Sequence, residues 1–128
     1  MSHWRRSAGS FRYALAGLRA LLITQPNVRI HLGLATLAVV LAALLGLSAA
    51  EWALLALTIG VVLAMEAMNS AVEAMVDLLQ PDHHALAGLA KDVAAAGVLL
   101  AAIASLAVGA CLFLPRIWLL LHLAEARP

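Results

Sequence analysis

Three long apolar stretches, joined by short polar segments, dominate the pattern of this chain. No Asp, Glu, Lys or Arg occurs in residues 30–50 or 93–114, and residues 52–79 are apolar except for a few polar positions. An α-helix needs about 20 predominantly apolar residues to cross the hydrocarbon core of a bilayer. We therefore predict three transmembrane helices, at about residues 29–47, 51–79 and 92–114.

Residues 4–24, which precede the first span, have an amphipathic pattern with a helical period. One face carries Trp4, Phe11, Leu15, Leu18 and Leu22, and a separate row carries Arg5, Arg12 and Arg19. The pattern predicts a helix that lies on the membrane surface and that Pro26 ends or bends, because proline lacks a backbone N–H. The arginines of such a helix can reach lipid headgroups or the phosphates of a nucleotide, and both interpretations stay open.

Turn and breaker residues mark the ends of the spans. Gly46 and Ser48 predict a short turn between the first two spans, and the loop QPDHH at residues 80–84 separates the second from the third. Pro115 is expected to end the third span and to leave residues 115–128 as a tail at the outer interface. Small residues recur every four positions along that span, at Gly97, Ala101, Ser105 and Gly109. Such a ridge lets another helix approach closely, and self-association is expected because three helices shelter polar groups poorly.

Composition decides the class of protein. The chain has 65% hydrophobic and 12% charged residues, and its mean hydropathy is +1.00. These values are too apolar for a water-soluble domain of this length and indicate an integral membrane protein. Three spans use most of the 128 residues, so we expect no separate soluble catalytic domain and place any chemistry on the helices and short loops.

The basic residues are distributed unevenly about the predicted spans. Lys91 and the arginines at positions 5, 6, 12, 19 and 29 fall on one side, whereas Arg116 and Arg127 fall on the other. Cytoplasmic segments carry an excess of Lys and Arg. We therefore expect a multi-pass protein of the plasma (inner) membrane with its N-terminus in the cytoplasm and its C-terminus outside.

The second span contains an acidic stripe in the segment EAMNSAVEAMVD, residues 66–77. Its polar members, which share one helical face, are Glu66, Asn69, Glu73 and Asp77. An ionisable side chain near the bilayer centre costs roughly 2.5 to 3.5 kcal/mol, so polar groups at this depth are functional by default. The structural alternative is that the carboxylates pair with basic residues of neighbouring helices. Between Arg29 and Glu51, His31 is the only ionisable residue.

These groups suit the transfer of a phosphoryl group to a membrane alcohol. Glu66 is the deepest carboxylate, and removal from water makes a glutamate a better general base. Glu73 and Asp77 lie nearer water, where carboxylate oxygens suit Mg²⁺, and Lys91 and Asp92 follow at the start of the third span. A Walker-type phosphate loop and a protein-kinase signature are both absent from the sequence, so a nucleotide site would be unconventional.

Four segments resemble the prokaryotic diacylglycerol kinase family, which includes the undecaprenol kinases. They are SFRYALAGLRAL, NVRIH, EAMNSAVEAMVD and DHHALAGLAKDVAAAGVL. The resemblance runs from about Arg6 to Pro115 in the family's order and spacing. It implies an all-α homotrimeric membrane enzyme, with a surface helix and three spans per subunit, that uses Mg-ATP to phosphorylate a lipid alcohol at the cytoplasmic interface.

The resemblance also implies residue roles. Glu66 would be the catalytic base with Asn69 as its partner, and Glu73 would be a metal ligand. The matching nucleotide-site positions are Arg6, Tyr13, Asp77, Asp82, His84, Lys91 and Asp92. The family usually has a second glutamate ligand where this chain has Gln25. An amide oxygen can still coordinate Mg²⁺, but the negative charge is lost.

Two other interpretations compete with the lipid kinase. The stripe suits a small proton- or ion-coupled transporter subunit, in which the carboxylates form a relay, although Lys91-Asp92 beside carboxylates at a water interface favours the kinase. An inactive scaffold that keeps the fold is the third. The expected partners are ATP, further copies of the chain and either diacylglycerol or undecaprenol, both of which present a primary hydroxyl at similar depth; nucleic acid is not expected.

Overall fold

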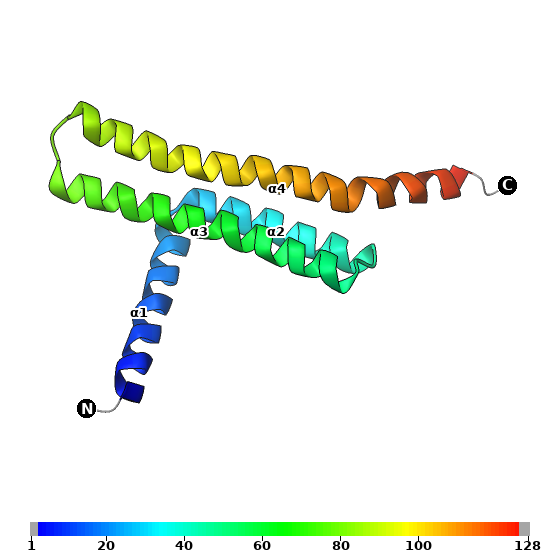
Figure 1. Cartoon of the computed structure of the whole chain (residues 1–128), viewed down its shortest axis with the longest axis horizontal. Helices are drawn as coiled ribbons and strands as arrows, with labels where there is room; N and C mark the ends of the chain where they lie inside the picture. Colours follow the sequence, from blue (N-terminus) through cyan, green and yellow to red (C-terminus); the bar gives the residue numbers. More distant parts are fainter. Residues whose placement is uncertain (1–2, 126–128) are drawn as a thin grey trace.

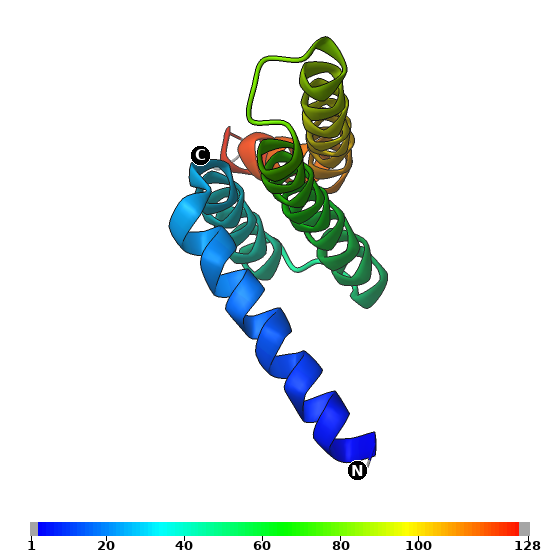
Figure 2. The same ribbon diagram turned by 90° about the vertical axis from the view of Figure 1, so that its left-hand side faces the viewer.

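The computed structural model describes residues 3–125, with side chains for residues 10–123. This part of the chain is helical throughout apart from its connecting segments, and its elements are α1 (His3–Thr24), α2 (Pro26–Leu44), α3 (Ala49–Leu79) and α4 (Ala85–Glu125). Helices α2, α3 and α4 lie side by side, and α1 projects away from them (Figures 1 and 2). Each of the three is long and apolar enough to cross a membrane. The all-helical class and the three candidate spans are therefore confirmed, whereas the surface position of α1 stays a prediction.

The connection between α2 and α3 is built from its local sequence. Gly46 adopts a positive φ of 66°, a conformation that glycine tolerates and that turns the chain after α2. Ser48 and Glu51 then form a capping box at the start of α3, in which each side chain bonds the backbone N–H of the other residue. The turn predicted from Gly46 and Ser48 is present. At the other end of α2, Gln25 is extended and Pro26 occupies the first turn, where a missing N–H costs nothing.

Helix α4 differs from the prediction at both ends. It begins at Ala85, so Lys91 lies within the helix and not at its start, and it continues through Pro115 to Glu125. The prediction that proline ends this helix and leaves a separate tail is wrong. Proline removes one backbone hydrogen bond, but Arg116 Nη1 donates to the carbonyl oxygen of Leu112 at 2.9 Å in the same region, and the leucine-rich sequence that follows favours helix. The last turns of α4 project beyond α2 and α3 (Figure 1).

Packing is closest between α3 and α4. A Cβ atom on Gly97 of α4 would lie only 2.5 Å from Cε of Met65 on α3, so this glycine permits the approach. The buried apolar cluster lies near the α2–α3 turn and contains Ala42, Leu47, Leu55 and Leu112. Many large apolar side chains elsewhere are exposed, as expected for surfaces that face lipid or other copies of the chain.

Candidate active site

Glu66 on α3 is the centre of the candidate site. The residue is 2% exposed, and it is the only buried charged residue in the described part of the chain. The nearest basic group comes from α2, where Nε2 of His31 lies 3.1 Å from Glu66 Oε1. The two groups are close but are not aligned as a hydrogen bond, so Oε1 is buried without a hydrogen-bond partner among the described residues. A buried carboxylate without a hydrogen-bond partner is destabilised until it accepts a hydrogen bond or a proton.

Asn69 and Glu73 form the next part of the stripe. Asn69 Nδ2 donates to Glu73 Oε1 at 2.9 Å, because residues four apart on a helix face each other. The sequence predicts Asn69 as the partner of Glu66, but in the structure Asn69 is hydrogen-bonded to Glu73. Asn69 Oδ1 is buried without a hydrogen-bond partner in the described part of the chain. Two oxygen-bearing groups, one of them charged, thus lie one and two helical turns beyond Glu66.

The end of α3 forms the water-facing part of the site. Lys91 Nζ on α4 donates to Asp77 Oδ1 on α3, and the Asp77 side chain is 66% exposed. Both residues line a cavity of about 340 Å³ beneath the α3–α4 loop, together with Gln80, Asp82, His83 and His84. His84 also supports the start of α4, because its Nδ1 accepts from Leu86 N–H at 3.2 Å. Four predicted nucleotide-site residues, Asp77, Asp82, His84 and Lys91, are therefore brought together.

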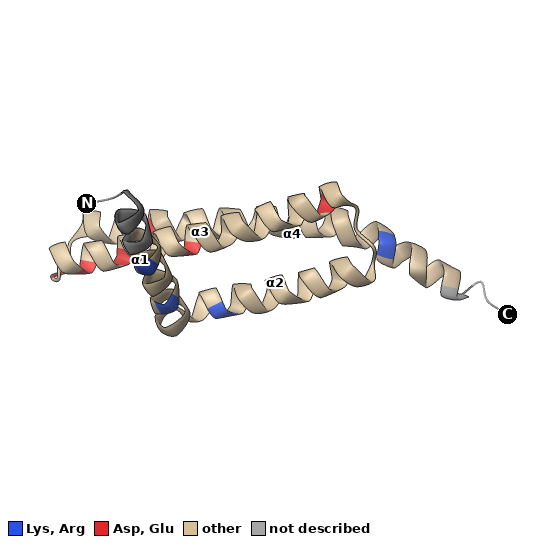
Figure 3. Ribbon diagram, turned by 90° about the horizontal axis from the view of Figure 1, so that it is seen from below, with Lys and Arg blue, Asp and Glu red and all other residues tan. Residues whose placement is uncertain are grey.

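The remaining predicted site residues lie elsewhere. Asp92 is exposed on α4 beside Lys91, and Gln25 is half-buried between α1 and α2. Tyr13 is 70% exposed on the projecting helix α1, where the guanidinium carbon of Arg12 lies 5.5 Å from the centre of its ring. The side chain of Arg6 lies outside the described residues. The acidic residues of α3 gather toward the α3–α4 loop, with one more at the opposite end of the helix (Figure 3).

A resident metal would have to be held by few protein groups. Within residues 3–125, no cluster of three or more His, Cys, Asp or Glu side chains is placed to hold a metal ion. The carboxylate of Glu73 and the unpartnered Oδ1 of Asn69 are nevertheless hard oxygen donors on one face of α3. This pair fits Mg²⁺, which commonly keeps several water ligands and binds through one or two carboxylates plus substrate phosphates.

An apolar groove of about 370 Å³ runs along α2, α3 and α4. Leu34, Leu41, Val62, Leu106 and Phe113 contribute to its walls, and His31 is the only ionisable side chain among the described residues that line it. His31 therefore borders both the groove and the buried carboxylate of Glu66. The sequence interpretation assigned His31 no role, although its position as the only ionisable residue between Arg29 and Glu51 was a signal that could have found it.

The arrangement combines a buried carboxylate, two oxygen donors one and two helical turns away, an ion pair at the water-facing end, and an apolar groove. A carboxylate with low exposure can accept a proton from a hydroxyl group that enters from the lipid phase. A lysine at the water-facing end can bind phosphate oxygens. Such a site can join a lipid alcohol to a phosphorylated donor from water.

Comparison with known proteins also indicates the phosphorylation of a lipid alcohol. Residues 12–113 match the family described as prokaryotic diacylglycerol kinase. The chain is 49% identical over 107 residues to a diacylglycerol kinase of Synechocystis, covering 83% of this chain and 61% of that protein. It is 36% identical over 108 residues to the undecaprenol kinase of Bacillus subtilis, covering 84% and 88%. It is 40% identical over 91 residues to the diacylglycerol kinase of Escherichia coli, covering 71% and 75%.

Proposed function

The chain belongs to the prokaryotic diacylglycerol kinase family, and from this premise we propose that it transfers the γ-phosphoryl group of ATP to the hydroxyl group of a membrane lipid alcohol. The observation that carries the proposal is the burial of Glu66, at 2% exposure, within a helix that is apolar enough to span a membrane. The names of the similar proteins supply the two substrate candidates, diacylglycerol and undecaprenol.

In the proposed reaction, Glu66 is the general base. The lipid hydroxyl oxygen attacks the γ-phosphorus, its proton passes to the Glu66 carboxylate, and ADP leaves. Burial supports this role because a carboxylate with little contact with water can accept the proton of a hydroxyl group that enters from the lipid phase. Bound Mg²⁺ would neutralise phosphate charge, with Glu73 as its protein ligand and Gln25 as a further candidate.

The water-facing cavity is the proposed nucleotide site. Its position beneath the α3–α4 loop gives access from the cytoplasm if the N-terminus is cytoplasmic, as the distribution of basic residues predicts. Lys91 supplies the cation for phosphate oxygens, and its contact with Asp77 orients it. Asp82 and His84 line the same cavity, and Asp92 follows Lys91 on α4. Arg6 and Tyr13 of α1 are proposed to complete the site.

The apolar groove along α2, α3 and α4 is the proposed position of the lipid tail. The groove ends at His31, whose Nε2 lies 3.1 Å from Glu66, so a tail in the groove places its polar end near the base. The projecting α1 and the exposed apolar faces of the spans are consistent with a homotrimer in which neighbouring copies complete each site.

The test is to give the purified protein in lipid vesicles radiolabelled ATP and, separately, diacylglycerol, undecaprenol and ceramide. We expect label in a lipid phosphate with at least one alcohol, and a rate of labelling about 10² to 10⁴ lower with the Glu66→Gln variant. Release of inorganic phosphate without a labelled lipid would contradict the proposal. Ion flux across the vesicle membrane that Glu66→Gln abolishes, in the absence of lipid phosphorylation, would support the transporter instead.

A further inference from the structure

The buried oxygen of Glu66 lies beside a potential donor that it does not use. Oε1 is buried and has no hydrogen-bond partner in the described part of the chain, yet Nε2 of His31 is 3.1 Å away. That distance is already within hydrogen-bonding range, so only the orientation of the groups has to change. A buried acceptor without a hydrogen-bond partner destabilises the folded state. The free energy of the site therefore favours a rotation of the imidazole ring that points Nε2–H at Oε1.

The two residues come from different helices. His31 lies on α2 and Glu66 on α3, and these helices are joined only by the turn near Gly46 at the far end of both. The contact therefore sets how the Glu66 side chain is held between the helices. Asn69, the residue expected to hold Glu66, is already engaged with Glu73. In the described part of the chain, no other charged side chain forms an ion pair with Glu66.

We propose that His31 is the positioning residue for Glu66 in the phosphoryl transfer, an inference that rests on the proposed function. Nε2–H of His31 donates to Oε1 in the reacting state, so Oε2 becomes the oxygen that accepts the proton. The lipid O–H bond breaks, the proton moves to Oε2, the new oxygen–phosphorus bond forms, and the bond from phosphorus to ADP breaks. His31 keeps its own proton throughout and makes no bond to the reacting atoms.

The position of His31 also connects the base with the lipid. The imidazole lines the end of the apolar groove, and its side chain is 22% exposed while that of Glu66 is 3% exposed. A lipid that enters along the groove therefore meets His31 beside Glu66. The same ring that orients the base limits where the hydroxyl group can stop.

Three substitutions test this role. His31→Gln keeps an N–H donor that can reach the position of Nε2, His31→Asn keeps an amide that is too short to reach it, and His31→Leu keeps volume without a donor. Misplacement of a catalytic group by about 1 Å can cost about 10²-fold in rate. We expect His31→Asn and His31→Leu to lower kcat by about 10- to 100-fold while the KM for ATP stays unchanged, and His31→Gln to recover most of that loss.

A double-mutant cycle separates positioning from a general structural effect. If His31 acts through Glu66, His31→Asn should cause no further loss of rate in a Glu66→Gln background, because coupled residues are not additive. Thr36→Val is the matched control. Thr36 is a polar residue of α2 whose hydroxyl group donates to the carbonyl oxygen of Leu32 in the same helix, and it does not line the groove. The Thr36→Val variant should retain wild-type kcat.

The outcomes separate the two proposals. A wild-type protein that phosphorylates no lipid alcohol overturns the proposed function and this inference with it. An active wild type whose kcat is equal in the Gln and Asn variants, or whose Asn substitution costs the same factor with and without Glu66, overturns the role of His31 alone. The Gln and Asn pair decides the question even if His31→Leu does not fold.

Discussion

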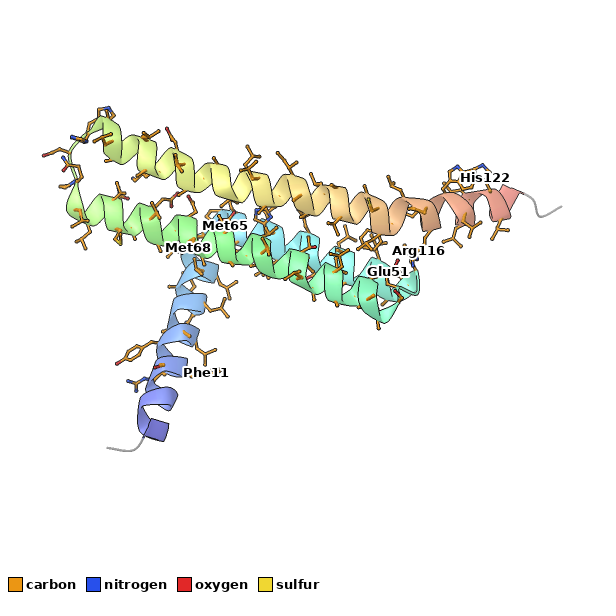
Figure 4. All side chains as sticks on the ribbon, in the orientation of Figure 1. Phe11, Glu51, Met65, Met68, Arg116 and His122 are labelled. Atoms are coloured by element: carbon orange, nitrogen blue, oxygen red, sulfur yellow. The ribbon has the colours of Figure 1, made fainter. Side chains whose placement is uncertain are left out.

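Arg116 on α4 and Glu51 at the start of α3 form a clamp between the two helices. Nη2 of Arg116 donates to both carboxylate oxygens of Glu51, at 2.9 Å to Oε1 and 2.8 Å to Oε2. Glu51 Oε2 also accepts from the backbone N–H and the hydroxyl of Ser48 at 2.8 Å each. The side chains of Glu51 and Arg116 lie together at the end of the bundle that carries the α2–α3 turn, opposite the α3–α4 loop (Figure 4). The clamp therefore ties the α2–α3 turn to the part of α4 that follows Pro115.

Loss of this clamp should lower the stability of the fold without changing the rate of phosphoryl transfer. Both side chains are roughly one-quarter to one-third exposed, so we expect Arg116→Ala to lower the free energy of unfolding by only about 1 kcal/mol. Unfolding in detergent, followed by circular dichroism, measures this loss. Arg29→Ala, which removes an exposed arginine, is the control and should change the unfolding free energy by less. A changed kcat in Arg116→Ala would contradict the separation of the clamp from the active site.

Gly97 should be more sensitive to an added methyl group than other helix glycines. A Cβ at Gly97 would meet Cε of Met65 at 2.5 Å, whereas a Cβ at Gly60 would meet nothing within 4 Å. Alanine is about 1 kcal/mol more favourable than glycine inside a helix, so Gly60→Ala should stabilise the protein and Gly97→Ala should gain less or destabilise it. In a Met65→Ala background the two glycine substitutions should become similar. A persistent difference there would mean that Met65 is not the cause.

Glu66→Gln and Glu73→Gln should reduce lipid phosphorylation in different ways. Glu66→Gln keeps the size of the side chain but cannot accept the proton, so lipid phosphorylation should fall by about 10² to 10⁴ while binding of Mg-ATP survives. Glu73→Gln removes the proposed metal ligand and should weaken nucleotide binding as well as transfer. Steady-state rates combined with equilibrium binding of a non-hydrolysable ATP analogue distinguish the two. Near-normal lipid phosphorylation by Glu66→Gln would move the role of base to Asp77 or Asp92.

Substitution of Gln25 tests whether the junction of α1 and α2 contributes to a metal site. Restoring the carboxylate with Gln25→Glu should lower the Mg²⁺ concentration for half-maximal activity by roughly tenfold, which corresponds to about 1.4 kcal/mol. Asn27→Asp introduces the same charge two residues away on an exposed side chain and should have a smaller effect. If both variants shift the Mg²⁺ dependence equally, the effect is one of general charge, and position 25 does not bind the ion.

The predicted orientation can be checked from the two ends of the bundle. In a Cys111→Ala background, a cysteine at Ala50 in the first turn of α3 should react with a membrane-impermeant maleimide added outside intact cells. A cysteine at His83 in the α3–α4 loop should react only after the cells are opened. Both positions are exposed, so access through the membrane decides the result. Labelling in the reverse order would place the proposed nucleotide cavity outside the cell.

The sequence by itself determined the features that depend on local periodicity and length. Apolar stretches long enough to span a bilayer predicted α2, α3 and α4, and the spacing of Glu66, Asn69, Glu73 and Asp77 placed them on one face of one helix. Gly46 and Ser48 predicted the first turn because each acts on its neighbours alone. These properties follow from residues a few positions apart, so no knowledge of helix packing was required.

Only the tertiary structure decided which side chains meet across helices. The contacts of His31 with Glu66, of Lys91 with Asp77, and of Arg116 with Glu51 join residues far apart in sequence. They depend on how the helices cross and rotate, and that geometry follows from side-chain volumes at contacts such as Gly97 against Met65. The continuation of α4 through Pro115 also depends on tertiary contacts. A missing backbone hydrogen bond predicted an end to the helix, but side-chain contacts of Arg116 with Leu112 and Glu51 support the helix beyond it.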